Sequence, residues 1–271
     1  MVRAGWGLAR GFDWGYALEV TKKPKGNRAM KILHRALGLV SLGLLAGCMS
    51  AGAPPQPAPV SEAAPVSAPL SAPLDSVAAA RQFLRVVDTV EPVAERLCRA
   101  QAPWLNCDFQ IVIDDRPNQP VNAYQTLDAQ GQPVLAFTLA MIAEVRNADE
   151  LAFVMGHEAA HHIAGHLTRQ RRNAQAGALV FAGLAALTGA EGQALQNAGE
   201  IGAQLGARTY SKDYELEADV LGTQITAQAG YDPLRGAAFF SRIPDPGDRF
   251  LGTHPPNAAR IEAVRQAASR L

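Results

Sequence analysis

The chain has 271 residues, and its 25 basic and 25 acidic side chains give a formal net charge of zero. This balance argues against the basic surface that nucleic-acid binding needs, so we expect no nucleic-acid partner. Hydrophobic residues make up 48% of the chain, which is ordinary for a globular core. The length allows one domain with extensions, or two small domains.

The beginning of the chain has the features of an export signal. Residues 1–29 show no clear periodicity, and we interpret them as an extension that is not part of the native protein. Residues 30–47 form a basic segment and an apolar run too short to span a membrane, as in a signal peptide. The run ends in Leu-Ala-Gly before Cys48, which resembles a bacterial lipobox with a lipidated cysteine. The alternative is a plain signal peptide or anchor helix with a chance cysteine.

Residues 48–76 are predicted to be a tether. They are rich in Pro, Ala and Ser, so they cannot bury a core and should be extended. At ~3.1 Å per residue the tether reaches about 80 Å from the lipid on Cys48. Met49 follows the cysteine, and by resemblance to lipoproteins of Gram-negative bacteria this points to the outer membrane. The folded domain is then residues 77–271.

The first part of this domain is predicted to be a helix followed by strands. Apolar residues recur at helical spacing over residues 77–99, with Pro92 as a potential kink or break. Residues 111–113 form a short apolar strand. Residues 121–127 and 134–138 flank an Asp-Ala-Gln-Gly turn signal, which predicts a hairpin.

The motif His-Glu-Ala-Ala-His begins at residue 157 and is the strongest chemical signal in the chain. A short helix over residues 139–146 precedes it, and Asn147 with Glu150 is typical of a helix start. His157 and His161 are four residues apart, so on a helix they lie on one face and can bind one metal ion. Zinc accepts neutral imidazole nitrogen and prefers four tetrahedral ligands.

Glu158 lies beside the first histidine, about 100° further around the helix, where it can act as a base without occupying the metal. The alternative is a helix that carries two histidines and a glutamate by chance. A third ligand must come from elsewhere, because His162 and His166 lie about 140° and 180° from His157 on a straight helix. We interpret these two as supporting, packing or surface histidines.

A candidate third ligand comes some fifty residues later. Glu215 and Asp219 are four residues apart and share a helix face, whereas Glu217 points to roughly the opposite side. Glu215 is predicted to bind zinc, and Asp219 to accept a hydrogen bond from the free N–H of a ligating histidine. A solvated acidic helix face is the alternative.

These motifs, in this order, resemble the M48 family of zinc peptidases, the gluzincins with HtpX-like and BepA-like members. Gly230 to Pro233 (Gly-Tyr-Asp-Pro), Thr253 to Pro256 (Thr-His-Pro-Pro) and Arg260 also follow in family order, and the resemblance covers roughly Ala78 to the C-terminus. It implies an α+β fold, mainly helical with a small antiparallel sheet, one Zn²⁺ per chain and metalloendopeptidase activity. We expect a lipoprotein form of the family without C-terminal repeats, since no helical repeats follow.

The resemblance also places His254 close to the metal. There it would be either a fourth ligand that holds the enzyme inactive, which we favour, or a donor to the oxyanion formed during attack. The alternative is a surface histidine that caps a turn.

The remaining segments are predicted to be helical. Residues 177–189 are apolar but too short to span a bilayer, and we favour a helical hairpin packed on the domain over contact with a membrane surface. Residues 192–206 and 212–230 are two further helices, and residues 232–271 supply more helix and the loop of His254. Cys98 and Cys107 would form a disulfide in an oxidising periplasm; two reduced cysteines are the alternative.

The predicted function is that of a zinc-dependent endopeptidase, lipid-anchored at the periplasmic face of the outer membrane. It would degrade misfolded or unassembled envelope proteins, with the outer-membrane assembly machinery as a partner. The alternative is a chaperone or assembly lipoprotein that uses the same fold without cutting. The intact Glu158 favours the enzyme, because a pure binder needs no base.

Overall fold

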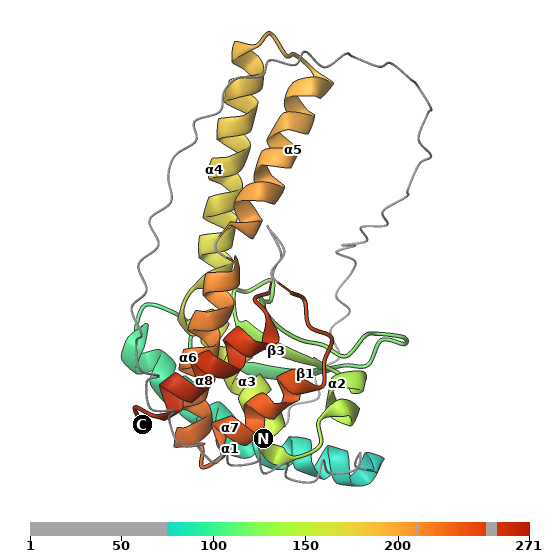
Figure 1. The fold of residues 1–271 in the computed structure, drawn as a ribbon, viewed down its shortest axis with the longest axis vertical. Coiled ribbons are helices and arrows are strands. Elements are labelled where there is room, and N and C mark those ends of the chain that lie inside the picture. The colour runs from blue at the N-terminus through green and yellow to red at the C-terminus, as the bar shows by residue number, and fades with distance from the viewer. Residues whose placement is uncertain (1–74, 210, 248–253) are drawn as a thin grey trace, which may run out of the picture. The chain divides into compact units, whose positions relative to one another are not determined.

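A computed structural model describes residues 75–209, 211–247 and 254–271 (Figure 1). The α+β, mainly helical fold is confirmed. The helices are α1 (Ser76–Gln101), α2 (Leu139–Glu144), α3 (Ala148–Ile163), α4 (His166–Leu187), α5 (Gln193–Arg208), α6 (Ser211–Gln228), α7 (Pro233–Ala237), the 3-10 helix η1 (Ala238–Ser241) and α8 (Asn257–Ala268). The strands are β1 (Gln110–Asp114), β2 (Ala123–Leu127) and β3 (Pro133–Thr138). The predicted extension, signal peptide, lipidated Cys48 and nearly all of the tether lie outside the described residues.

The three strands form one sheet in the order β1-β3-β2. The predicted hairpin is confirmed, because β2 pairs antiparallel with β3 around the turn that contains Gly131. β1, however, pairs parallel with β3, so the sheet is mixed and not purely antiparallel as expected. Every residue of β3 is buried, which places this strand at the centre and leaves its second edge for β1.

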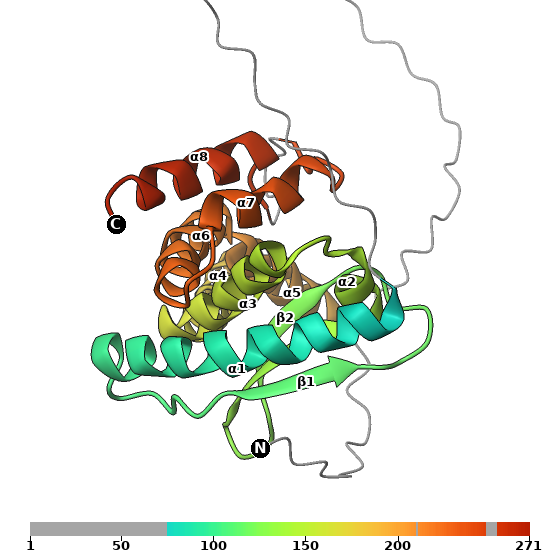
Figure 2. The same cartoon turned by 90° about the horizontal axis from the view of Figure 1, so that it is seen from below.

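α1 runs through Pro92 as one helix, so the proline does not break it. Val86 and Val90 before the proline and Val93 after it are all buried. Burial of this continuous apolar face offsets the roughly 3 kcal/mol that an interior proline costs a helix. Figure 2 shows α1 alongside α3 and the sheet, and its Phe83 ring meets Phe137 of β3 edge-on at 5.4 Å between centroids.

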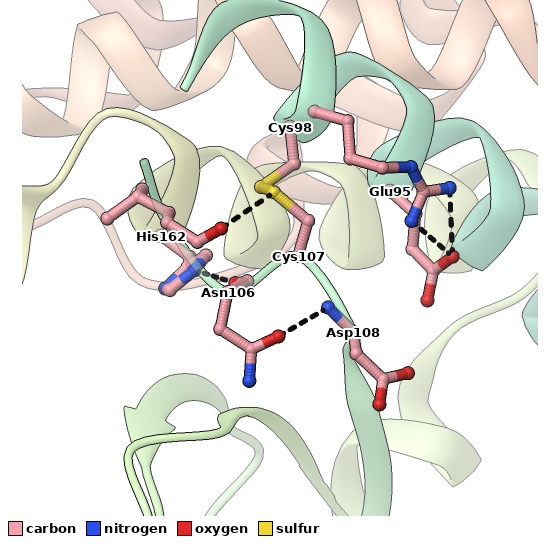
Figure 3. The surroundings of a disulfide bond; sticks show 8 residues. Glu95, Cys98, Asn106, Cys107, Asp108 and His162 are labelled. Carbon is pink, nitrogen blue, oxygen red and sulfur yellow. Dashed lines mark hydrogen bonds and ion pairs between the residues drawn. A yellow bond between two sulfur atoms is a disulfide. The ribbon is translucent and has the colours of Figure 1, made fainter. Parts of the chain in front are cut away.

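A disulfide joins Cys98 near the end of α1 to Cys107 in the segment that leads to β1 (Figure 3). The loop that it closes is tied to α3, because the backbone carbonyl of Asn106 accepts a hydrogen bond from His162 Nε2 at 2.8 Å. The ring of His162 also meets Phe109 edge-on. This histidine therefore belongs to the packing between α3 and the disulfide loop.

α3 begins as the sequence predicts, with Asn147 accepting a hydrogen bond from the backbone N–H of Glu150. The Glu150 carboxylate reaches back to the backbone N–H of Arg146 and also forms a two-pronged, buried ion pair with Arg242, both prongs at 2.7 Å. α3 then packs against α6 where Gly156 meets Gly222, so the two backbones come into direct contact. The start of α3 and its crossing with α6 are thus both fixed by close contacts.

α4 and α5 form the predicted helical hairpin (Figure 1). Its helices meet through glycines, since a Cβ on Gly202 would lie 2.2 Å from the backbone oxygen of Gly177. The apolar residues are not packed on the domain as expected: Leu179 is 76% exposed and Leu187 is 85% exposed. The hairpin is two helices thick, and no other described element covers the outward side chains of these two helices over most of their length. Within the described ranges, none of the helices is both long and apolar enough to cross a bilayer.

Candidate metal site

His157, His161 and Glu215 come together as a group that could hold a metal ion. The Nε2 atoms of the two histidines are 3.0 Å apart. The Glu215 carboxylate lies 3.5 Å from the first of them and 3.4 Å from the second. Ligand atoms about 2.0–2.2 Å from a tetrahedral zinc ion lie roughly 3.3–3.6 Å apart. The two histidine–carboxylate distances match this range and the two histidine nitrogens are closer, so the donor set fits zinc in its chemistry and needs only a small separation of the two rings.

The outward nitrogen of His157 is held by a carboxylate. His157 Nδ1 lies 2.9 Å from Asp219 Oδ1, the contact that the sequence predicted for this aspartate. Asp219 is fully buried, and Arg260 of α8 binds both of its oxygens at 2.7 and 2.8 Å. The Arg260 guanidinium also lies over the ring of Phe240, 3.9 Å from its centroid. A buried arginine thus fixes the aspartate that orients His157.

The outward nitrogen of His161 is held by another histidine. His161 Nδ1 lies 2.7 Å from His166 Nδ1. The straight-helix argument that placed His166 on the far side is wrong here, because α3 ends at Ile163. Gly165 then adopts the left-handed region with φ of 68°, which turns the chain back toward the site. His166 therefore supports His161 rather than facing solvent.

The charges of the site favour a cation between these side chains. Burial lowers the pKa of His157, but hydrogen bonds with Asp219 and Glu215 outweigh it and raise the pKa to about 9. Burial likewise raises the pKa of Glu215, yet its histidine partners hold that pKa well below the usual range. His166 is different, because burial and the nearby His161 lower its pKa to about 4 and keep it neutral at pH 7.

A cavity of about 570 Å³ opens beside these residues. Glu158 lines it together with His157 and His161, so the predicted base borders the same space as the candidate metal-binding histidines. Residues 121–125, which include the start of the edge strand β2, line another wall. The cavity therefore brings together a candidate metal site, a carboxylate base and the backbone of an open sheet edge.

Comparison with protein families identifies the chain. The model of Peptidase family M48 matches residues 80–268. The chain belongs to peptidase family M48. The predicted resemblance to this family is thereby confirmed.

This M48 peptidase is also similar to curated proteins. It shares 29% identity over 167 residues with the beta-barrel assembly-enhancing protease of Escherichia coli O157:H7, which covers 57% of this chain and 34% of that protein. It shares 34% identity over 142 residues with the putative beta-barrel assembly-enhancing protease of Vibrio cholerae, covering 47% and 29%. For the Yersinia pestis protein the values are 30% over 138 residues, covering 46% and 28%. The chain thus spans about a third of the length of these relatives.

His254 lies at the edge of the site in this M48 chain. Its Nδ1 is 3.0 Å from Glu215 Oε2, and its side chain is 52% exposed. It therefore contacts a predicted metal ligand from the solvent side, and it stands outside the three-residue group whose donor atoms converge.

Three side chains of the site had no assigned role at the level of sequence. Arg260 was noted only as part of a family pattern, and neither Arg242 nor His166 carried a specific role. The signal for His166 was available, because a glycine shortly after the last residues of a helix is typical of a helix end. Nothing in the local sequence connects Arg242 to Glu150 or Arg260 to Asp219, because these partners lie 92 and 41 residues apart along the chain.

Proposed function

We propose that the chain is a zinc-dependent endopeptidase in which His157, His161 and Glu215 bind the ion. The observation that carries the proposal is the convergence of one ligand atom from each of these residues to within 4.8 Å of one another, beside a cavity that Glu158 also lines. Three protein ligands are typical of catalytic zinc sites, which keep one position open for water or substrate.

A zinc ion at this site would supply Lewis acidity toward the peptide carbonyl and lower the pKa of water toward ~7. Glu158 would take the proton from the attacking water and return it to the leaving nitrogen. Asp219, held by Arg260, keeps the Nδ1 of His157 protonated, so Nε2 is the nitrogen that would give up its proton and offer a lone pair to the ion. Each residue therefore has a distinct task in peptide hydrolysis.

The edge of the sheet supports an extended peptide as the substrate. Among the described strands β2 pairs only with β3, and residues 123–125 of β2 line the cavity. An extended segment can add to such an edge through backbone hydrogen bonds, beside Glu158 and the metal-binding atoms. Backbone pairing tolerates many side chains, which suits substrates that are unfolded.

We place the enzyme in the periplasm, attached to the outer membrane through a lipid on Cys48. The disulfide between Cys98 and Cys107 supports an oxidising compartment, and the relatives are named for β-barrel assembly. Its substrates would be misfolded or unassembled envelope proteins, and the assembly machinery would be a partner. Sequencing the mature N-terminus tests the anchor: a chain that starts at Met1 or Met30 contradicts it.

Metal analysis and a proteolysis assay test the catalytic proposal together. The parent chain should bind one zinc ion and cleave unfolded casein. Glu158→Gln should keep the zinc and lose about 10²–10⁴-fold in rate, because only the base is removed. Glu215→Ala should lose both zinc and activity. A parent chain without zinc, or a Glu158→Gln variant as active as the parent, would overturn the proposal.

The same assay separates the enzyme from the alternative, a chaperone or assembly lipoprotein on this fold. A non-proteolytic protein would suppress aggregation of an unfolded substrate equally well as parent and as Glu158→Gln, with no cleavage by either. The position of Glu158 on the cavity wall beside two metal-binding histidines favours the enzyme.

For His254 we propose the restraining role. Its contact with Glu215 places the ring at the mouth of the site, where it would compete with substrate for the space beside the ligands. His254→Ala should then raise the rate of casein cleavage. A rate lower by roughly 10²-fold would instead assign it as an oxyanion donor, and an unchanged rate would leave only a surface role.

A further inference from the structure

We propose that His166 and Glu217 form a relay that sets the tautomer and the orientation of the metal-binding residue His161. The relay rests on the proposed function, because it concerns the same zinc ligand. His161 Nδ1 is 2.7 Å from His166 Nδ1, and His166 Nε2 is 3.2 Å from Glu217 Oε2. These contacts join α3, the first residue of α4 and the exposed side of α6.

The direction of the hydrogen bonds follows from the carboxylate. An ionised Glu217 only accepts hydrogen bonds, so the proton of His166 must sit on Nε2. A neutral His166 then has an unprotonated Nδ1, which can only accept, and His161 must donate its own Nδ1–H. The consequence lies at the other end of the His161 ring, where Nε2 keeps its lone pair and points at the metal site.

The surroundings of His166 hold its ring in one plane. The ring stacks on Tyr214 of α6, with centroids 4.8 Å apart and planes 14° apart. The Tyr214 hydroxyl accepts a hydrogen bond from Asn173 of α4 at 3.0 Å. Arg169 lies over the same tyrosine ring and binds Glu217 Oε2 at 2.6 Å. A histidine that only filled space would need none of these directed contacts.

The two histidine ligands are therefore supported in parallel ways. His157 donates directly to the carboxylate of Asp219, whereas His161 reaches the carboxylate of Glu217 through one intervening imidazole. A ligating histidine whose other nitrogen is fixed by hydrogen bonding binds metal in a defined orientation. His166 and Glu217 are thus positioning residues, because neither donates an atom to the three-residue metal group.

The tautomer of His166 can be measured directly. In the full chain labelled with ¹⁵N-histidine, long-range ¹H–¹⁵N correlations distinguish a proton on Nε2 from one on Nδ1. The relay requires the Nε2–H tautomer of His166 with and without zinc, and an Nδ1–H on His161 when zinc is bound. A proton on Nδ1 of His166 would overturn it.

Zinc affinity provides the second measurement, by competition with a chromogenic chelator. Glu217→Ala and His166→Phe should each weaken zinc binding, by about 10–100-fold for the loss of such a support. The phenylalanine keeps the aromatic ring over Tyr214, and Glu217 is largely exposed, so both variants should fold. Glu217→Gln keeps an oxygen that can accept from His166 and should restore part of the affinity.

Two matched controls address general damage. Asp213→Ala removes an exposed carboxylate one turn earlier on α6, and His162→Phe makes the same change in the neighbouring buried histidine of α3. Both should bind zinc as the parent does. If Glu217→Ala and His166→Phe also match the parent, the relay is wrong while the zinc site stands. If the parent binds no zinc, the proposed function is wrong, and the tautomer of His166 still decides the relay.

Discussion

The crossing of α3 with α6 and the pairing of α4 with α5 are both made by glycines, but the two helix pairs differ in how deeply they are buried. In both, glycines bring two helix backbones into contact. A Cβ on Gly222 of α6 would lie 2.9 Å from the backbone nitrogen of His157, and a Cβ on Gly202 of α5 would lie 2.2 Å from the backbone oxygen of Gly177. The close approach alone therefore does not decide what a helix pair becomes.

The difference lies in what covers the outer faces. α3 is covered by α1 and the sheet, so its polar groups are buried and must be paired: His157 with Asp219, and Glu150 with Arg242. α4 and α5 cover only each other over most of their length, and Leu179 and Leu187 stay exposed. Where a further layer of structure covers a helix pair, as α1 and the sheet cover α3, charged side chains can be buried in pairs. Where that layer is missing, as over α4 and α5, even apolar side chains face solvent.

The largest expected effect on stability comes from breaking the buried ion pair between Glu150 and Arg242, which lies in the part of the domain outside the α4–α5 hairpin. Glu150→Ala leaves Arg242 buried without its carboxylate and removes a cap of α3, and it should cost about 3–5 kcal/mol of unfolding free energy. Urea denaturation measures this. Glu191→Ala, in the exposed turn between α4 and α5, is the control and should change stability by no more than about 0.5 kcal/mol. Equal losses of unfolding free energy in Glu150→Ala and Glu191→Ala would show that the two regions do not differ in this way.

A smaller effect should follow from the same substitution at the two glycine contacts. Gly222→Ala should cost about 1–3 kcal/mol through overpacking and lower the zinc content, because the methyl group meets the backbone of His157. Gly202→Ala should open the α4–α5 contact and leave the zinc content unchanged. Hydrogen exchange would show lost protection confined to α4 and α5. Loss of zinc from Gly202→Ala would mean that the hairpin and the site are not separable.

A still smaller effect is expected where a glycine of the hairpin has room. A Cβ on Gly183 in α4 would meet nothing within 4 Å. Gly183→Ala should therefore stabilise α4 by about 0.5–1 kcal/mol through helix propensity alone. Slower exchange of the α4 amides would show it, and faster exchange would indicate a contact that this glycine requires.

The smallest expected effect is on the pH dependence of stability, and it again concerns the part of the domain outside the α4–α5 hairpin. A hydrogen bond from Arg116 outweighs burial and lowers the pKa of Asp114 to about 2. A lowered pKa adds stability above the unfolded value near 3.8, and this is lost as pH falls toward 2. Because Arg116 is exposed, we expect only about 0.5 kcal/mol. Asp114→Asn should be less stable than the parent at pH 6 and equal to it near pH 2. A difference in unfolding free energy that stays the same at both pH values would exclude this charge effect.

The sequence predicts the parts of the site that depend on one helix at a time. Spacing of four residues correctly grouped His157 with His161, and Glu215 with Asp219, because helical phase is reliable over a single turn. For His166 the same reasoning correctly excluded a third ligand but placed the side chain on the far side of the helix, because it assumed a straight helix through Gly165. The roles of Arg260 and Arg242 could not be predicted, because each depends on how distant segments pack.

In the fold, too, features with a local sequence signal were predicted and features that depend on distant segments were not. The β2–β3 hairpin follows from a local turn signal, but the parallel pairing of β1 with β3 joins segments with no local signal between them. The apolar run over residues 177–189 predicted burial, because such residues usually lie inside. Whether a layer is present to cover a helix depends on how the whole chain packs, and in the part of the chain that the structure describes Leu179 and Leu187 of the hairpin stay exposed.

The disulfide has a consequence for how this protein reaches its folded state. Closing the loop between Cys98 and Cys107 restricts the unfolded chain, which stabilises the fold by roughly 2–3 kcal/mol in the loop-entropy description. His162, the neighbour of His161, donates its hydrogen bond to a carbonyl inside that loop (Figure 3). A chain in a reducing environment lacks this cross-link, so the loop that packs against α3, the helix of the proposed metal-binding histidines, is closed only after oxidation.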